Sequence, residues 1–388
     1  MSDTDENLAL LPNGFVDILP PHAQCEAKSI AILIGIFESY GYALIKPPLL
    51  EFEDSLLAPG PGARLAPETF RLMDPVTHRM LGVRSDITSQ IARIVSSRFK
   101  NEVRPVRLTY ANDVLRTKGS QMRTVRQFTQ VGCELITKEA DIQADVEICV
   151  LSVLGLKSLG VENITLDFTV PGLVNKILEK ASAKNKDAIK KAVAQRDKDA
   201  LIAIGSEPAQ MIAGLISARG VHTQAFDILE NVPLTDDLGC DISRLRDVCD
   251  HVSEALVQLE MGGVDITLDF LEQSGFEYHK SLGFTLFSLD VSGELGRGGQ
   301  YDVNFDLGEN EDDTQDMASG FTLYMDTVSK IRKFDEDVKS ILVNCACPWS
   351  DIQRLQSDGW VVLRNISGAN KEQCSHEYDH NSDEIKEV

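Results

Sequence analysis

The sequence contains 388 residues, of which 43% are hydrophobic, and its 60 Asp and Glu residues against 38 Lys and Arg residues give a formal net charge of −22 at pH 7. The hydrophobic fraction is typical of a globular protein, and the length predicts two domains or three. Because so acidic a chain repels polyanions, we do not expect tRNA as a partner.

The N-terminal sequence MSDTDENLALLPNG is acidic and has no basic segment followed by an apolar one, so we expect neither a signal peptide nor a transit peptide. No stretch approaches the roughly 20 apolar residues of a membrane-spanning helix, so we expect no membrane partner. The eight cysteines, several of them in apolar runs, are typical of reduced, buried thiols. These features together predict a cytoplasmic protein.

The first hundred residues alternate between helical and extended patterns. Apolar residues at helical spacing predict a helix over 22–40, and 42–48 resembles a strand that two prolines end. Residues 69–83 predict a hairpin with its turn at 74–77, and a helix is expected over 87–99.

Two long strand-like segments, 103–116 and 126–137, flank a loop and predict an antiparallel pair. Residues two apart in a strand share a face, so Gln130, Gly132 and Glu134 are expected to point into one pocket. A carboxylate and an amide at this spacing suit a zwitterionic ligand.

The remaining sequence predicts helices and strands in separate blocks. A helix over 141–159 and a strand over 161–168 are followed by 171–239, where Ala, Lys and Asp at helical spacing indicate a helical segment. A helix over 241–261 leads back to the sheet. Residues 331–388 read as a strand, a helix, a strand and a polar tail, which predicts a short αβ piece.

Several segments resemble the motifs of class II aminoacyl-tRNA synthetases of the histidyl branch, in the order of that family. Segment 22–48 resembles motif 1, which forms the homodimer interface in the family. LRTKGSQMRTVRQFTQVGCE (115–134) resembles motif 2, and GFTLYMDT (320–327) resembles motif 3. RSDIT (84–88) resembles the Arg-Pro-Glu-x-Thr element.

Two further elements carry the same resemblance. SGFEYH (274–279) resembles the histidine signature Arg-Gly-Leu-Asp-Tyr-Tyr, and GRGGQYD (296–302) resembles Gly-Gly-Arg-Tyr-Asp with Gln300 in place of the arginine. The resemblance implies an α+β fold, in which a class II synthetase-like antiparallel sheet is flanked by helices. Residues 1–330 would form this domain, with a helical insertion at about 171–239, and 331–388 would be an αβ remnant in place of an anticodon-binding domain.

The chain departs from the family on the ATP side. Lys118 replaces the motif 2 glutamate that faces the adenine amine, Ser274 replaces an activating arginine, and Thr327 replaces the motif 3 arginine on the γ-phosphate. A cation cannot accept a hydrogen bond from an amine, and a hydroxyl offers one donor where a guanidinium offers five. Removing such a donor commonly lowers a rate by ~10²–10³. We therefore expect no catalytic residues and no adenylation.

The amino-acid side of the motifs is preserved. The resemblance implies a histidine site formed by Asp86, Thr88, Arg116, Gln130, Glu134, Tyr278, His279 and Tyr301. The α-ammonium would meet Asp86, Gln130 and Glu134. The imidazole would lie near Tyr278 and His279, with Tyr301 closing the pocket. Simpler explanations are that Asp86 only caps the following helix and that His279 is an isolated imidazole on a surface strand.

This combination resembles the regulatory subunits of ATP phosphoribosyltransferase in histidine biosynthesis. The resemblance implies assembly with a short-form catalytic subunit, required for the first step of the pathway, self-association as a dimer, and histidine as the feedback effector, without a cofactor. Two alternatives stay open. One is a divergent histidyl-tRNA synthetase or amino-acid adenylating ligase that uses Arg116 in a rearranged ATP pocket, and the other is a scaffold with a vestigial pocket.

Two other interpretations are not favoured. The glycines of 296–299 lead into an acidic segment and not into a helix, which argues against dinucleotide binding. The thiols and imidazoles of Cys345, Cys347, Cys374, His376 and His380 match no closed zinc site, so no metal is predicted.

Overall fold

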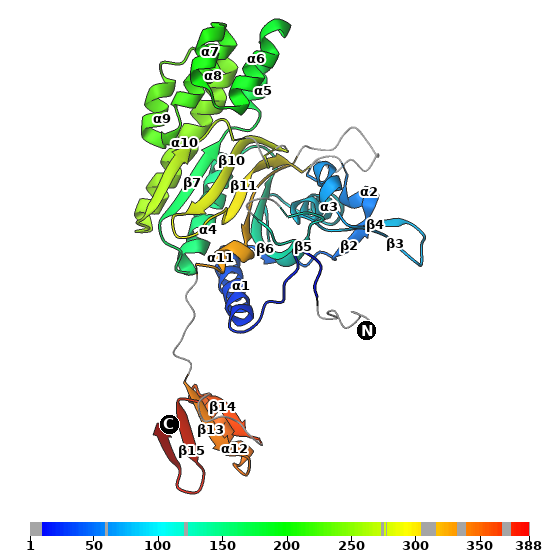
Figure 1. Ribbon diagram of the computed structural model, residues 1–388, viewed down its shortest axis with the longest axis vertical. Coiled ribbons are helices and arrows are strands. Elements are labelled where there is room, and N and C mark those ends of the chain that lie inside the picture. Colours follow the sequence, from blue (N-terminus) through cyan, green and yellow to red (C-terminus); the bar gives the residue numbers. More distant parts are fainter. Residues whose placement is uncertain are drawn as a thin grey trace, which may run out of the picture. The chain divides into compact units, whose positions relative to one another are not determined.

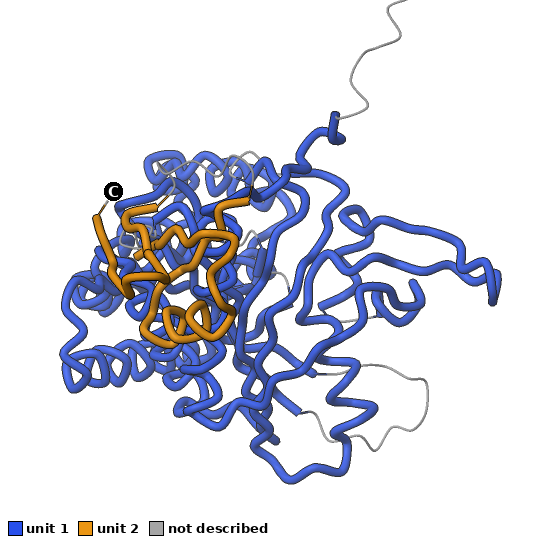
Figure 2. Tube along the Cα trace, turned by 90° about the horizontal axis from the view of Figure 1, so that it is seen from below, with its two compact units in different colours: residues 1–332 blue, residues 333–388 orange. Residues whose placement is uncertain are grey.

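The computed structural model describes residues 10–58, 61–119, 123–272, 275–276, 278–303, 316–331, 339–366 and 374–387. The chain forms two compact units, residues 1–332 and 333–388 (Figure 2). None of the helices in the described ranges has the length and apolar character needed to cross a membrane.

A nine-stranded sheet, counted over the described residues, organises the larger unit (Figure 1). Its spatial order is β1 (Ala43–Leu44), β5 (Val106–Leu115), β6 (Gln127–Thr137), β12 (Met317–Tyr324), β11 (Gly296–Asp302), β10 (His279–Ser288), β7 (Ile164–Thr169), β9 (Val264–Leu268) and β8 (Gly220–Val221). Neighbours from β5 to β7 pair antiparallel, whereas β1 with β5 and β7 with β9 pair in parallel. The predicted α+β fold with an antiparallel central sheet is confirmed.

Three long helices cover one face of this sheet: α1 (His22–Ser39), α4 (Ile142–Ser158) and α10 (Asp236–Gln258). Leu33 and Phe37, four residues apart on α1, are fully buried against the sheet, as the helical spacing predicted. Helix α4 is apolar almost all round because it lies between the sheet on one side and the other two helices on the other.

The alternation of β6 separates this helical layer from the opposite face. Val131, Cys133 and Leu135 belong to the core with α1 and α4, while Phe128 and Ile136 belong to a second core with α3 (Thr88–Arg98). Residues of one strand parity thus face the three long helices, and Glu134, of the other parity, faces α3.

A small sheet accompanies α3 on that side of the molecule. Its strands are β2 (Leu50–Phe52), β4 (Met80–Val83) and β3 (Arg71–Met73), with α2 (Glu53–Leu56) and a 3-10 helix, Ala63–Glu68, in the connection. The predicted hairpin of 69–83 is confirmed, because β3 and β4 pair antiparallel.

Short helices fill the segment between β7 and α10: α5 (Leu173–Glu179), α6 (Ala183–Ala194), α7 (Lys198–Ile204), α8 (Glu207–Ser217) and α9 (His222–Leu229). Their ends carry recognisable signals. Asp197 caps α7 by accepting a hydrogen bond from the Ala200 amide at 2.9 Å, and Gly205 ends the same helix with φ +68°. Strand β8 lies within this segment, where the sequence predicted helices alone.

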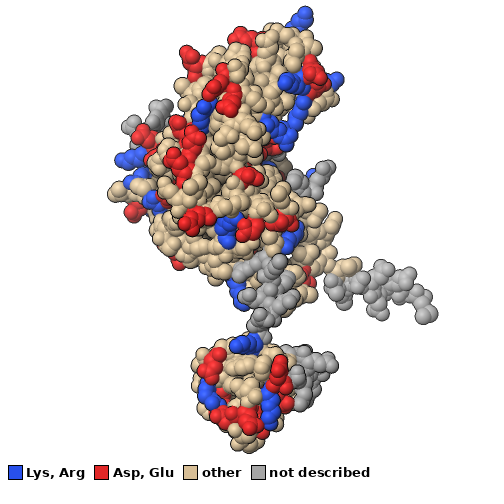
Figure 3. Space-filling model, turned by 90° about the vertical axis from the view of Figure 1, so that its left-hand side faces the viewer, with Lys and Arg blue, Asp and Glu red and all other residues tan. Residues whose placement is uncertain are grey.

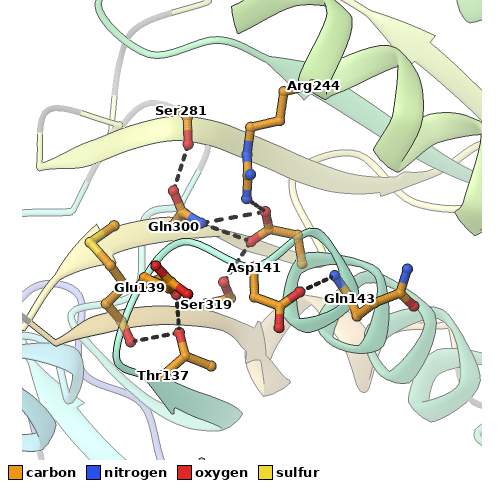
Figure 4. A network of polar contacts seen from close by, with 10 residues as sticks. Thr137, Glu139, Asp141, Gln143, Arg244, Ser281, Gln300 and Ser319 are labelled. Carbon is orange, nitrogen blue, oxygen red and sulfur yellow. Dashed lines mark hydrogen bonds and ion pairs between the residues drawn. The ribbon is translucent and has the colours of Figure 1, made fainter.

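A buried polar network joins α4 to the back of the sheet (Figure 4). The Asp145 carboxylate, fully buried, pairs with Arg244 of α10 at 2.6 Å and accepts hydrogen bonds from Ser319 at 2.5 Å and from the Gln300 amide at 3.4 Å. Burial raises the pKa of Asp145, although Ser319 and Arg244 act against it. Gln300 therefore faces α4, on the other side of β11 from its neighbour Tyr301.

The smaller unit has a four-stranded sheet among its described residues, in the order β14 (Val361–Asn365), β13 (Ser340–Asn344), β15 (His376–Asp379) and β16 (Glu384–Glu387). Helix α12 (Trp349–Ser357) packs Ile352 and Leu355 against Ile341, Val343 and Tyr378. The strand–helix–strand prediction is confirmed, and the polar tail adds β15 and β16. Cys345 is exposed, whereas Cys347 and Cys374 are buried. Within the described ranges, His, Cys, Asp and Glu side chains form no group of three or more that is suited to a metal ion.

Candidate functional site

A cavity of about 750 Å³ lies in the larger unit, on the face of the sheet that Glu134 shares with α3. Seven of the eight residues expected to bind histidine line it: Asp86, Thr88, Arg116, Glu134, Tyr278, His279 and Tyr301. They come from segments up to 215 residues apart in the chain. The fold therefore brings the predicted residues together, with Gln130 as the exception.

Gln130 orients Asp86 and does not line the cavity. Its amide nitrogen donates to Asp86 Oδ2 at 2.9 Å, and its oxygen accepts from the Ile87 amide at 3.1 Å. Asp86 Oδ1 accepts from the Thr88 amide at 2.9 Å. Asp86 thus caps the first turn of α3 and faces the cavity at the same time, so the capping explanation and the site role are compatible.

Glu134 is the most buried acid of the cavity, with 1% of its surface exposed. Its carboxyl accepts hydrogen bonds from the hydroxyls of Tyr301 at 3.0 Å, Tyr110 at 3.4 Å and Thr88 at 3.5 Å. Burial is the main cause that raises the pKa of Glu134 to about 8, and the nearby Asp86 charge adds to it. At neutral pH this carboxyl is therefore mostly protonated.

Two glycines allow the side chains of Glu134 and His279 to lie against the surface of the sheet. Gly320 pairs with Glu134 in the β6–β12 register, and a Cβ on Gly320 would lie 1.8 Å from Glu134 Oε2. A Cβ on Gly299, the next residue across, would lie 2.4 Å from the His279 ring. Both positions need glycine because the carboxyl and the imidazole occupy that space.

An aromatic cluster forms the adjacent wall. The His279 ring stacks on Tyr278 with centroids 4.2 Å apart, and Tyr278 meets Tyr301 edge to face at 5.7 Å. Burial, together with the charge of Arg297, lowers the pKa of His279 to about 3, so its imidazole is neutral. Its Nδ1 has no hydrogen-bond partner among the described residues. His279 is therefore packed in the wall of the cavity and is not an isolated surface imidazole.

Several arginines also line the cavity, and each of the following pairs with a carboxylate. The ion pairs are Arg116 with Glu68 at 3.4 Å, Arg123 with Asp326 at 3.0 Å, Arg297 with Glu294 at 2.8 Å, and Arg196 and Arg219 with Asp269 at 2.7 and 3.2 Å. The sequence interpretation named none of these pairs. Most join residues that are distant in the chain, and the motifs that contain Arg116, Arg123 and Arg297 did not indicate their acidic partners. The cavity is consequently polar but charge-compensated.

The positions that differ from the family on the ATP side lie in different surroundings. Thr327, in the short helix α11 (Met325–Val328), is buried and lines the cavity. Lys118 is exposed and is not among the lining residues. Ser274 lies outside the described residues. Among the described residues, Thr327 is thus the one of these three positions that lines the cavity. It places a hydroxyl where motif 3 of the family has an arginine.

Glu134 makes the free energy of unfolding depend on pH in a defined direction. The pKa of Glu134 is about 8 in the folded chain and 4.5 for an ordinary glutamate. Between these two pH values the carboxyl is therefore protonated in the folded chain and ionised in the unfolded chain. This contribution is full below about pH 4.5 and is lost as the pH rises through about 8. Between about pH 5.5 and 8.5, urea unfolding should show a larger loss of stability for the wild type than for Glu134→Gln. An equal loss in the two proteins would contradict the raised pKa.

Comparison with known proteins supplies the family. A family model described as histidyl-tRNA synthetase matches residues 14–328. The ATP phosphoribosyltransferase regulatory subunit of Rhodospirillum centenum is 38% identical over 379 residues, covering 95% of this chain and 94% of that protein. The protein of the same name from Paramagnetospirillum magneticum is 36% identical, with coverage of 94% and 92%. The chain belongs to the ATP phosphoribosyltransferase regulatory subunit family.

Solved structures agree with the fold of this family. A Bacillus halodurans protein titled ATP phosphoribosyltransferase regulatory subunit/histidyl-tRNA synthetase has a TM-score of 0.76 at 20% identity, covering 94% of this chain and 95% of that one. Histidyl-tRNA synthetase from Nostoc has a TM-score of 0.74 at 16% identity, with coverage of 98% and 96%. The expected class II synthetase-like fold is confirmed. The prediction of a regulatory, non-catalytic subunit is confirmed by the family of the relatives.

Proposed function

We propose that this chain senses histidine and assembles with a short-form catalytic subunit of ATP phosphoribosyltransferase. In this role it is required for the first step of histidine biosynthesis and for feedback inhibition of that step by histidine. The observation that carries the proposal is the pair of acids Asp86 and Glu134 in the cavity. Both accept hydrogen bonds from Thr88, and both lie beside the aromatic wall. The names of the relatives support the catalytic partner.

The charge-compensated cavity supports an amino acid as the ligand. A nucleotide brings several negative charges, which need unpaired cations, whereas five arginines of the cavity already pair with carboxylates. An amino acid brings one positive and one negative charge and leaves the balance unchanged. Asp86 and Glu134 suit its ammonium, and Tyr278, His279 and Tyr301 suit a flat, partly polar ring.

Glu134 adds a chemical reason for an ammonium ligand. A buried, protonated carboxyl ionises when a cation arrives, because the opposite charge favours the charged form. Asp86, held by Gln130 and the Thr88 amide, is the second acceptor. Histidine then shifts the equilibrium between two arrangements of the complex. The size of the shift is set by the difference between its affinities for the two arrangements.

Self-association as a dimer is part of the proposal. Exposed apolar side chains occur in β1, in β2 and the loop between them, and in the β3–β4 hairpin: Leu44, Leu49, Leu50, Leu72, Met73, Val76 and Met80. Apolar side chains of this number on neighbouring elements favour burial against another chain. On the face shown in Figure 3, acidic and basic side chains are interspersed, which does not favour binding to tRNA.

The test is co-expression with the short catalytic chain, affinity purification through one of the two, and an assay of phosphoribosyl transfer. We expect the two chains to co-purify, the activity to depend on this subunit, and histidine to inhibit it. Isothermal titration calorimetry of this chain alone should show heat on addition of histidine. Histidine-dependent exchange of pyrophosphate into ATP would instead support an adenylating ligase. Absence of binding heat would support a scaffold with a vestigial pocket.

A further inference from the structure

Two aromatic rings and an arginine lie together at one end of the cavity. Phe128 of β6 and Tyr324 of β12 meet edge to face, with ring centroids 6.0 Å apart. The guanidinium of Arg123 lies 3.8 Å from the centroid of the Tyr324 ring and 4.7 Å from that of the Phe128 ring. Arg123 and Tyr324 both line the cavity. A planar cation therefore occupies the aromatic end of the cavity.

Arg123 is held in this position by its side chain and by its backbone. The side chain is 11% exposed, and its Nε donates to Asp326 Oδ2 at 3.0 Å. A Cβ on Gly119 would lie 2.9 Å from the carbonyl oxygen of Arg123, so the backbone on the two sides of the β5–β6 loop is in close contact there. Withdrawing the guanidinium would uncover the rings and leave the largely buried Asp326 carboxylate without its cation.

The groups that hold Arg123 are also groups that bind a nucleobase. A guanidinium is planar and stacks on aromatic faces, as a base does. Asp326 supplies acceptor oxygens at the edge of the planar group, and its Oδ1 is buried without a hydrogen-bond partner among the described residues. A carboxylate of this kind accepts a hydrogen bond from the exocyclic amine of a base as well as from a guanidinium. The side chains of Phe128, Tyr324 and Asp326 thus form a latent base site that Arg123 fills.

We propose that Arg123 excludes purine nucleosides from the cavity by occupying this latent base site. The cavity then accepts a small ligand beside Glu134 and rejects a flat base at its aromatic end. Phe128 is six residues from Glu134 on β6, which is about 20 Å of strand. The exclusion therefore goes beyond the proposed function and does not depend on which ligand binds beside Glu134.

Arg123→Ala should open the latent base site. Isothermal titration calorimetry with adenosine, which carries no charge, should show binding at least ~10-fold tighter than in the wild type, since stacking of one base on an aromatic side chain commonly contributes such a factor. Adding Phe128→Leu to this variant should remove the gain, because one of the rings is lost. Arg219→Ala is the matched control. Arg219 also lines the cavity and pairs with a carboxylate, that of Asp269, and its removal should leave adenosine affinity at the level of the wild type.

A second variant separates the opened site from damage to the fold. Arg123→Ala leaves the Asp326 carboxylate without its ion pair, whereas the double variant Arg123→Ala, Asp326→Asn carries no uncompensated charge. Thermal unfolding followed by circular dichroism should give a midpoint for the double variant close to that of the wild type. The double variant should show the same gain in adenosine affinity, because the amide oxygen of asparagine still accepts from the amine.

Equal adenosine affinity in the wild type and in the folded double variant would overturn the inference, whether both bind or neither does. A gain that survives Phe128→Leu would also overturn it, because adenosine would then bind elsewhere. Histidine is titrated separately, and its affinity for Arg123→Ala should stay within about threefold of that for the wild type. A wild type that binds no histidine would contradict the proposed function, and the adenosine titrations would still decide the role of Arg123.

Discussion

Glu134→Gln should strongly weaken histidine binding while leaving the fold intact. The amide has the shape of the protonated carboxyl, so the hydroxyls of Tyr301 and Tyr110 keep a partner and stability at pH 7 should change little. The amide has no negative charge to offer an ammonium. Losing one member of a buried charge pair commonly costs about 2–5 kcal/mol, so we expect affinity in calorimetry to fall ~30-fold or more.

The matched control for this change is Asp167→Asn. Asp167 also lines the cavity and its pKa is also raised, chiefly by burial, but its carboxyl is engaged by Thr267. Histidine affinity should stay within about threefold of the wild type, because the substitution lies away from Asp86 and Glu134. Unchanged histidine binding by Glu134→Gln would remove Glu134 from the site.

Binding should also release a proton near neutral pH. The pKa of about 8 means that Glu134 is mostly protonated at neutral pH, and an arriving ammonium favours the ionised form. Calorimetry in two buffers of different ionisation enthalpy measures the released proton directly. The same pair of titrations on Asp167→Asn should give the same result as the wild type.

Arg244→Met should be among the most destabilising single substitutions in the larger unit. It leaves the Asp145 carboxylate, which is fully buried, without its cation. Breaking a buried ion pair in this way typically costs about 3–5 kcal/mol, a large part of the stability of a domain. Thermal unfolding should show a lower midpoint for the larger unit.

The pH dependence of this loss identifies its cause. Since burial already raises the pKa of Asp145, removal of Arg244 raises it further and the carboxyl can take up a proton in acid. The destabilisation should therefore be smaller at about pH 5 than at about pH 8. The double variant Asp145→Asn, Arg244→Met should recover part of the stability at pH 8. A loss independent of pH in Arg244→Met would indicate that lost packing, and not an uncompensated charge, is responsible.

Local pattern predicted the elements that have a clear period. Alternation in 126–137 gave β6 and the shared face of Gln130 and Glu134, and helical spacing gave α1. The same alternation did not show that the Gln130 amide is bonded to Asp86 and to the Ile87 backbone, because the orientation of an amide depends on its partners, which here are 44 and 43 residues away. Strands β15 and β16 were missed because charged residues dominate both.

The cavity arginines were beyond the reach of pattern for a different reason. Arg196 follows α6, and the sequence around it carries no pattern that predicts Asp269 as its partner. The two residues come together because the chain returns to the sheet through β9, directly before Asp269. Arg297 stood within a quoted motif, yet its direction into the cavity became clear only from the cross-strand register with Thr322.

Each unit has a hydrophobic core of its own, which has a consequence for calorimetry. The core cluster of residues 333–388 contains, in the described ranges, six buried side chains: Ile341, Val343, Cys347, Ile352, Leu355 and Tyr378. A core of this size stabilises the folded unit only slightly more than the conformational entropy of the unfolded chain destabilises it. Heating should therefore produce two separate endotherms, the first and smaller one from the C-terminal piece, and histidine should move only the second.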